Sequence, residues 1–263
     1  MENFDIILPQ GRLSAVRLNA QGERLVVVLH GYGDTYNMML SVAEQFVAKN
    51  CEVVLFDLPL HGTSAWTDKV FGAAEVAETL LFLLKNNTKP FDLLGYSVGG
   101  RLALCAVPLL AKAEKIPENV YLLAPAGAPQ NVVHNYIEMP LFLKKVTWFL
   151  VEKTGFWLPF ARFLYKKNVI SKFEMAFVEK YLGNVEKRNM MFVWWLSLSF
   201  LKIDFEAINV LFLQKKMKIH LFFGENDTIL PKNTVGFYKK NLLHTSCKNI
   251  VATHRNMSYI EIF

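Results

Sequence analysis

The stretch Phe91-Asp-Leu-Leu-Gly-Tyr-Ser-Val-Gly-Gly-Arg101 joins a short apolar run to a helical pattern through the sequence G-x-S-x-G. A strand over 91–97 followed at once by a helix over 98–112 requires a sharp turn at Ser97. Such a turn strains the serine backbone and exposes its hydroxyl. Glycines at 95 and 99 remove side chains that would clash across the turn. The helix N-terminus also offers free N–H groups to developing negative charge. The stretch therefore predicts Ser97 as a catalytic nucleophile.

The chain on both sides of this stretch alternates between apolar β-branched runs and amphipathic helical segments. This alternation predicts an α/β fold, with a mostly parallel twisted sheet and helices on both of its faces. Further strands are expected at 4–9, 13–18, 24–30, 51–57, 119–125, 218–224 and 248–253, and further helices at 36–49 and 72–86.

The alternation stops after residue 125 and resumes near 214. We expect residues 1–125 and 214–263 to form the catalytic core. Residues 126–213 are expected to form an all-helical lid over the carboxyl edge of the sheet, where open α/β sheets place their active sites. The lid is predicted as several short helices, broken at Pro140, Gly155, Pro159 and Gly183.

Four of the five tryptophans fall in the predicted lid, at 148, 157, 194 and 195. Aromatic residues at helical spacing often form the core of such a segment. On another face of the same helices they would roof an acyl group or a ring. Trp148 and Trp194 are the candidate substrate-binding residues.

A serine hydroxyl needs a base to take its proton, and the base needs a carboxylate to orient it. His254 follows the last predicted strand directly and is the expected base, while His244 falls in a predicted helix. Asp227 follows the strand at 218–224 and is the expected acid, with Glu225 as its rival. The order serine, aspartate, histidine is the one expected of this fold.

Acyl transfer also requires donors aimed at the oxyanion. The backbone N–H of Val98 is expected to be the first. The second is expected from the loop after the strand at 24–30, through the backbone N–H of Tyr32. His30 in the same loop is interpreted as a hydrogen-bonding residue that fixes the loop, not as a catalyst.

The segments HGYGD (30–34), DLPLHGTS (57–64), GYSVGG (95–100) and GENDTILP (224–231) together resemble the α/β-hydrolase superfamily. The resemblance covers the sheet-forming parts and implies the same fold and the same catalytic and oxyanion residues. Two positions depart from the family pattern. Leu60 stands where a glycine is usual, and Thr253 replaces the usual glycine before the catalytic histidine.

Arg101 lies four residues after Ser97, on the same face of the predicted helix. The run Ser97-Val-Gly-Gly-Arg101 is similar to the menaquinone-pathway lyase of this superfamily, which eliminates pyruvate from an anionic ring substrate. In that enzyme the arginine helps to bind carboxylates. Three functions therefore remain open: an esterase-like hydrolase, such a lyase, and a superfamily member that has lost catalysis and acts as a binding scaffold.

The composition is that of a globular chain, with 52% hydrophobic and 20% charged residues. A net charge of +6 allows weak contact with an anionic membrane surface, but no dense basic stripe indicates a nucleic-acid partner. The expected partner is a small acyl or anionic amphipathic molecule. We expect no cofactor, metal, signal peptide or transmembrane segment. Three widely spaced cysteines favour a reducing, cytoplasmic location, and the oligomeric state stays open.

Overall fold

The computed structural model of the chain describes residues 1–68, 70–128, 140, 142–143, 149, 154–170, 175–176, 178–179, 184–243 and 245–263. It divides into two compact units. Residues 1–130 and 201–263 form unit 1, and residues 131–200 form unit 2.

A nine-stranded sheet forms the centre of unit 1, in the order β1-β2-β4-β3-β6-β7-β8-β9, with β5 paired to β2. From β4 to β9 along this path all strands run parallel, whereas β1, β2 and β5 pair antiparallel. The predicted α/β-hydrolase architecture is therefore confirmed. The strands are Glu2–Leu8, Gly11–Leu18, Arg24–Leu29, Cys51–Phe56, Ala65–Trp66, Phe91–Tyr96, Asn119–Leu123, Lys218–Gly224 and Ser246–Ile250, for β1 to β9 in chain order.

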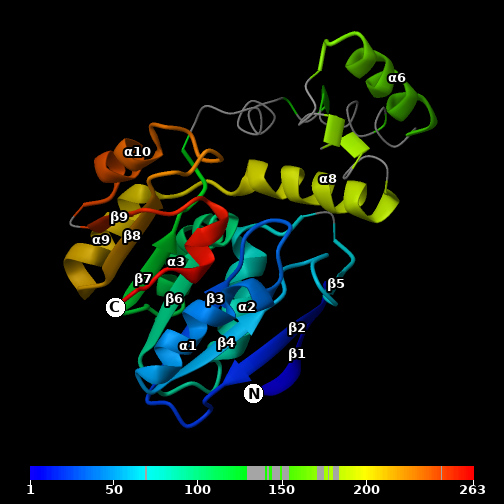
Figure 1. Ribbon diagram of the computed structural model, residues 1–263. Helices are drawn as coiled ribbons and strands as arrows, with labels where there is room; N and C mark the ends of the chain where they lie inside the picture. The colour runs from blue at the N-terminus through cyan, green and yellow to red at the C-terminus, as the bar shows by residue number, and fades with distance from the viewer. Residues whose placement is uncertain are drawn as a thin grey trace. The chain divides into compact units, whose positions relative to one another are not determined.

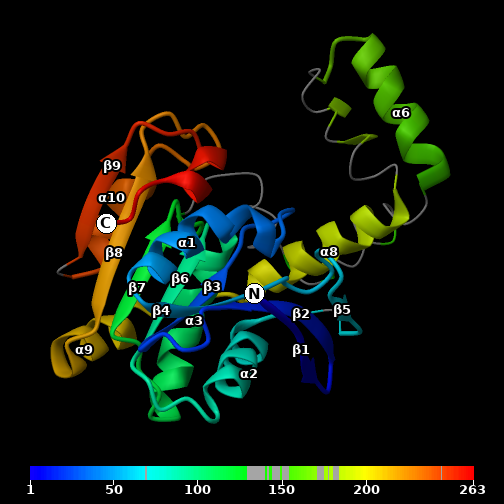
Figure 2. The same cartoon turned by 60° about the horizontal axis from the view of Figure 1, so that its bottom comes forward.

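Helices cover both faces of this sheet (Figures 1 and 2). A short 3-10 helix, Tyr36–Met39, and α1, Leu40–Ala48, lie on one face, with the C-terminal 3-10 helix η2, Arg255–Tyr259. The opposite face carries α2, Ala73–Leu84, and α3, Val98–Lys112. Helices α9, Phe205–Lys215, and α10, Thr234–Asn241, complete unit 1. Because α9 belongs to unit 1, the division after residue 200 falls earlier than the predicted lid boundary at 213.

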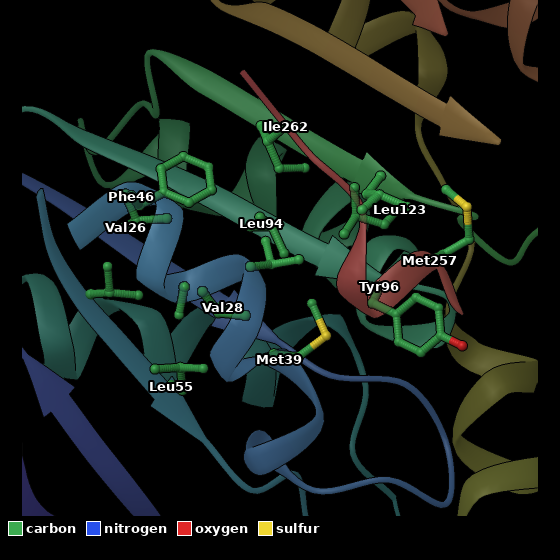
Figure 3. Packing of buried hydrophobic residues seen from close by; sticks show 14 of the residues in the cluster. Val26, Val28, Met39, Phe46, Leu55, Leu94, Tyr96, Leu123, Met257 and Ile262 are labelled. Atoms are coloured by element: carbon green, nitrogen blue, oxygen red, sulfur yellow. The ribbon is translucent and has the colours of Figure 1, made fainter. Parts of the chain in front are cut away.

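One hydrophobic core lies between the sheet and α1 (Figure 3). Val26, Val28, Leu55 and Leu94 project from neighbouring strands toward Phe46 on α1, and all are 1% exposed or less. Their strands read as continuous apolar runs because parallel strands are buried on both faces. The C-terminal segment closes the same core with Met257, Ile260 and Ile262. This packing fixes the carboxyl ends of the central strands, where the predicted catalytic residues lie.

In unit 2 the structure describes α6, Thr154–Lys166, and α8, Val185–Phe200. The predicted helix break at Pro159 is wrong, because α6 runs through this residue, whereas Gly155 lies at the start of α6. Pro159 lies in the second turn, where its ring nitrogen removes only the backbone bond to the Gly155 carbonyl. Gly183 lies outside the described residues. None of the described helices is both long and apolar enough to span a bilayer.

Candidate active site

Ser97 lies at the turn between β6 and α3, in the conformation that the G-x-S-x-G pattern predicts. Its backbone has φ 52° and ψ −115°, a region of the Ramachandran map that residues other than glycine avoid. The turn is held by two backbone bonds: the Ser97 N–H donates to Leu123 at 2.9 Å, and the Ser97 carbonyl accepts from Ala126 at 2.9 Å. A Cβ on Gly99 would collide with the Leu29 carbonyl oxygen. The neighbouring strands thus force the strained geometry that presents the hydroxyl.

Asp227 lies in the loop that follows β8. Its Oδ1 atom accepts hydrogen bonds from the backbone N–H groups of Ile229 at 2.8 Å and Leu230 at 3.0 Å. Burial alone would raise the pKa of this carboxyl, but the hydrogen bonds from His254 and from the two backbone groups lower it below the ordinary value. The carboxylate is therefore ionised at neutral pH, and its stabilising effect is lost only as pH falls through that lowered pKa.

His254 joins the aspartate to the serine. Its Nδ1 atom is 2.6 Å from Asp227 Oδ2, and its Nε2 atom is 3.0 Å from Ser97 Oγ. Because Asp227 is ionised and accepts, the imidazole proton lies on Nδ1, and Nε2 is left as the acceptor for the serine hydroxyl. The structure thus brings Ser97, His254 and Asp227 into one hydrogen-bonded chain. Glu225 is exposed and bonds Ile250 through its backbone N–H, and His244 lies outside the described residues.

The two oxyanion donors predicted from the sequence lie on separate elements. Val98 is the first residue of α3, so its N–H has no partner within the helix. Tyr32 lies in the segment 30–34, which we call the oxyanion loop, between β3 and the 3-10 helix. Its ring makes an edge contact with His61, with ring centroids 5.8 Å apart. The assignment of both N–H groups as oxyanion donors stays a proposal.

Two buried histidines hold the oxyanion loop. His30 accepts from the Leu58 N–H at 2.9 Å through Nε2, and His61 accepts from the Gly33 N–H at 2.9 Å in the same way. The Nδ1 atom of each lies within 2.9 Å of a backbone carbonyl, that of Gly31 for His30 and of Pro59 for His61. Only one protonation pattern satisfies all four contacts, with the proton on Nδ1 of both rings. The sequence indicated this role for His30 but not for His61, although His61 lies in the DLPLHGTS segment.

Burial keeps both of these rings neutral. It lowers the pKa of His30 to about 3, an effect to which the neighbouring His61 adds, and it lowers the pKa of His61 to about 4. The unfolded chain takes up these protons at an ordinary pKa near 6.5. Between these values the unfolded state therefore binds more protons than the folded state, and stability falls as pH falls.

We expect the free energy of unfolding to fall between pH 6.5 and pH 4, by up to about 1.4 kcal/mol per pH unit for each histidine. Urea denaturation at a series of pH values measures this slope. His61→Gln should flatten the slope, because its amide oxygen still accepts from Gly33 but does not titrate. His61→Leu should instead lower stability at pH 7, by about 1–3 kcal/mol, because a buried N–H loses its acceptor. A His61→Gln variant with the wild-type slope would contradict this origin.

Arg101 lies one turn into α3, and its guanidinium is engaged by the chain itself. Its Nε atom donates to the Leu201 carbonyl oxygen at 2.9 Å, and its Nη2 atom donates to the same oxygen. Leu201 is the first residue of unit 1 after unit 2. Arg101 is thus hydrogen-bonded to a residue 100 positions later in the sequence, a contact that helical spacing alone does not reveal.

The structure says less about the two predicted substrate-binding tryptophans. Trp194 is a fully buried residue of α8 in unit 2. Trp148 lies outside the described residues. Their predicted contact with substrate remains a prediction.

The chain is similar to known proteins both in its sequence pattern and in its fold. The model of the serine aminopeptidase S33 family matches residues 20–233, well over half of the chain. Among solved structures, a carboxylesterase from the thaumarchaeon Nitrososphaera gargenis superposes with a TM-score of 0.64 at 11% identity, covering 97% of this chain and 92% of that one. A thermophilic esterase from Thermogutta terrifontis gives 0.63 at 14% identity, covering 98% and 93%. These likenesses show the fold alone.

Curated relatives add a second kind of similarity. The 2-succinyl-6-hydroxy-2,4-cyclohexadiene-1-carboxylate synthases of Salmonella typhimurium and Salmonella agona are each 36% identical to this chain over 109 residues. The match covers 41% of this chain and 40% of each synthase, so it spans well under half of the relatives' length.

Proposed function

Since the chain belongs to the serine aminopeptidase S33 family of α/β hydrolases, we propose that it is a serine hydrolase that cleaves an ester or a related acyl bond. The observation that carries the proposal is the continuous contact from Ser97 Oγ through His254 to Asp227, at 3.0 Å and 2.6 Å. Both distances lie within hydrogen-bonding range of a nucleophile, its base and the base's orienting group.

The chemistry proceeds in two halves. Ser97 Oγ attacks the carbonyl carbon while His254 Nε2 takes the hydroxyl proton, and the negative charge of Asp227 stabilises the imidazolium that forms. The backbone N–H groups of Val98 and Tyr32 receive the oxyanion. His254 then gives its proton to the leaving group, and an acyl-enzyme remains. Water, activated by the same histidine, releases the acid in the second half.

A catalytically inactive scaffold is the alternative that is simplest to test. A fluorophosphonate probe reacts only with a serine whose hydroxyl an adjacent base activates. Labelling of the native protein, and its loss in the variant Ser97→Ala, supports the hydrolase. A folded native protein that resists labelling would favour the scaffold.

The likeness to the Salmonella synthases favours one second candidate, a lyase that eliminates pyruvate from an anionic ring substrate. The run Ser97-Val-Gly-Gly-Arg101 supports the same candidate, because it resembles the segment of that lyase in which an arginine helps to bind carboxylates. The bonds from Arg101 to the Leu201 carbonyl weigh against it, because a substrate carboxylate would have to share or displace them. We therefore place the hydrolase first.

Substrate length separates the two enzymes. The aromatic composition of residues 126–213 favours an apolar acyl group, so each added methylene should contribute up to about 0.8 kcal/mol, roughly fourfold in kcat/KM, until the binding region is full. We expect p-nitrophenyl butyrate and octanoate to be better substrates than acetate. A flat profile across the three, together with pyruvate release from the lyase substrate, would overturn the hydrolase in favour of the lyase.

Arg101 provides the matched control for this comparison. In the lyase, Arg101→Ala should remove about 2–5 kcal/mol of binding to a substrate carboxylate and destroy pyruvate release. In the hydrolase, ester turnover should persist at temperatures where the variant stays folded, because neutral esters need no cation. A thermal melt run beside each assay separates lost folding, through the Leu201 contact, from lost substrate binding.

A further inference from the structure

Tyr96, the residue before the serine, reaches from the end of β6 to the segment that carries His254. Its side chain is buried, and its hydroxyl donates to the His254 carbonyl oxygen at 3.0 Å. The two rings also lie against one another, with centroids 5.3 Å apart. Figure 3 shows the Tyr96 hydroxyl beside the short C-terminal helix that contains Met257. The motif that presents the serine thus also contacts the backbone of the base.

The same ring also packs on the oxyanion loop. A Cβ on Gly31 would lie 2.9 Å from Tyr96 Cε1, so the ring occupies the space that a side chain there would need. Only glycine at this position lets the loop approach the ring closely. Tyr96 therefore contacts both the oxyanion loop and His254.

The segment before His254 leaves the sheet and is held at a few points. Strand β9 ends at Ile250, and Val251 is 78% exposed. Ala252 is buried in the core, and its carbonyl accepts from the Asn226 N–H in the loop of the acid. The imidazole is held through Nδ1 by Asp227. The Tyr96 hydroxyl adds a fixed point on the His254 carbonyl, which also accepts from the Met257 N–H at 3.2 Å.

The phenol is a permanent donor in this place. Burial raises the pKa of Tyr96 well above its ordinary value, and the nearby carboxylates of Asp34 and Asp227 raise it further against the opposing charge of Arg255. The hydroxyl therefore keeps its proton at every pH at which the protein is folded, and the contact with His254 does not switch with pH.

We propose that Tyr96 is a positioning residue for the reaction: one side chain sets where the His254 imidazole stands relative to Ser97 and the oxyanion loop. The inference rests on the proposed hydrolase function and adds a residue to it. Small misplacements of a reacting group cost large factors in rate, about 10²-fold for 1 Å. Removing the hydroxyl should therefore lower the rate of the chemical step and leave substrate binding unchanged.

The test is the variant Tyr96→Phe, which keeps the ring and removes only the hydroxyl. With p-nitrophenyl butyrate we expect kcat to fall about 10- to 100-fold while KM stays within about twofold. Thr79→Val is the matched control, because it also removes a buried hydroxyl that donates to a backbone carbonyl, that of Glu75 in α2, at 2.8 Å. It has no contact with the triad and should change kcat far less.

A spectroscopic measurement reads the position of His254 without turnover. The Nδ1 proton shared with Asp227 should give a downfield proton resonance that is absent in His254→Ala. In Tyr96→Phe we expect this resonance to move or broaden, and in Thr79→Val to stay. Gly31→Ala, whose Cβ would press on the Tyr96 ring, should shift the same resonance.

The two proposals fail separately in this experiment. A native protein that neither hydrolyses esters nor reacts with a fluorophosphonate sinks the hydrolase, whatever Tyr96 does to the resonance. A native protein that does both, with a Tyr96→Phe variant that matches it in kcat and in the His254 resonance, sinks the positioning role alone. Equal losses of kcat in Tyr96→Phe and Thr79→Val would also overturn it, since general destabilisation would then explain the effect.

Discussion

Ser97→Ala is expected to abolish ester turnover and labelling by a fluorophosphonate, with a loss of kcat of about 10⁶-fold. Loss of one member of a triad that acts as a unit costs about as much as loss of all three. The reason is that His254 Nε2 lies 3.0 Å from Ser97 Oγ and can take its proton, which makes this oxygen the nucleophile. Alanine keeps the backbone and every bond that the Ser97 peptide makes.

The same substitution should leave the fold in place, with a melting temperature within a few degrees of the native protein. The strain of the turn belongs to the backbone, since φ is 52° at a residue with a Cβ, and it remains in alanine. Ser97→Gly relieves it, because such strain costs about 1–3 kcal/mol and glycine does not incur it. Glycine loses about 0.5–1 kcal/mol through its greater freedom in the unfolded chain. We therefore expect the glycine variant to be inactive and at least as stable as the alanine variant.

Paired activity assays and chemical denaturation measure both outcomes. Full ester turnover in a folded Ser97→Ala protein would remove the nucleophile assignment and with it the hydrolase. A glycine variant clearly less stable than alanine would leave that assignment standing but contradict a strained turn at Ser97.

The fold was predictable from the sequence because its signals are local. Continuous apolar runs such as Leu25–Leu29 are typical of strands covered on both faces, and eight of the nine described strands match the predicted ones to within a few residues at each end. The two-residue strand β5 was not predicted, because it is too short to leave a pattern in the sequence. The sharp turn at Ser97 is equally local, since glycines before and after the serine specify it. The predicted lid, which ends at 213, includes most of helix α9. The sequence of this helix does not reveal that Ile208 is buried in unit 1.

Parts of the site that depend on contacts across the chain were not predictable in this way. The pairing of Arg101 with Leu201 and of Tyr96 with the His254 carbonyl joins residues 100 or more positions apart. Helical spacing placed Arg101 on the face of Ser97, but a backbone carbonyl as its partner leaves no trace in the sequence. The motif marked Tyr96 only as a variable position between Gly95 and Ser97.

Leu60 illustrates a departure that the structure explains physically. The family pattern has glycine at this position. The backbone at Leu60 has φ 63°, the left-handed conformation that glycine adopts without cost. The turn therefore keeps a glycine-type geometry with a leucine in it, at a cost of about 1–2 kcal/mol. The neighbouring Gly62 has no such freedom, since a Cβ there would overlap the Asp57 carboxylate.

Changes at the base and the acid should have effects almost as large as those at the serine, and they differ in a way that tests the geometry. His254→Ala removes the proton acceptor, and kcat should fall by about 10³–10⁶-fold. Asp227→Asn should lower kcat about 10⁴-fold by a different route. The asparagine oxygen still accepts from Ile229 and Leu230, so the loop survives, but its NH₂ group faces Nδ1 and favours the tautomer with the proton on Nε2. That imidazole points a donor at the serine hydroxyl and no longer serves as its base.

The controls are the residues that the sequence offered as rivals. Glu225→Gln and His244→Ala should change kcat by less than about twofold, because Glu225 is exposed and Asp227 already fills the contact with His254. Steady-state kinetics at pH 8 on all four variants, with thermal melts to confirm folding, completes the comparison. A silent His254→Ala beside an inactive His244→Ala would show that the base is the other histidine. An Asp227→Asn variant with native kcat would show that the carboxylate holds the loop without orienting the base. The amide can still hold the loop, but it cannot orient His254 as the carboxylate does.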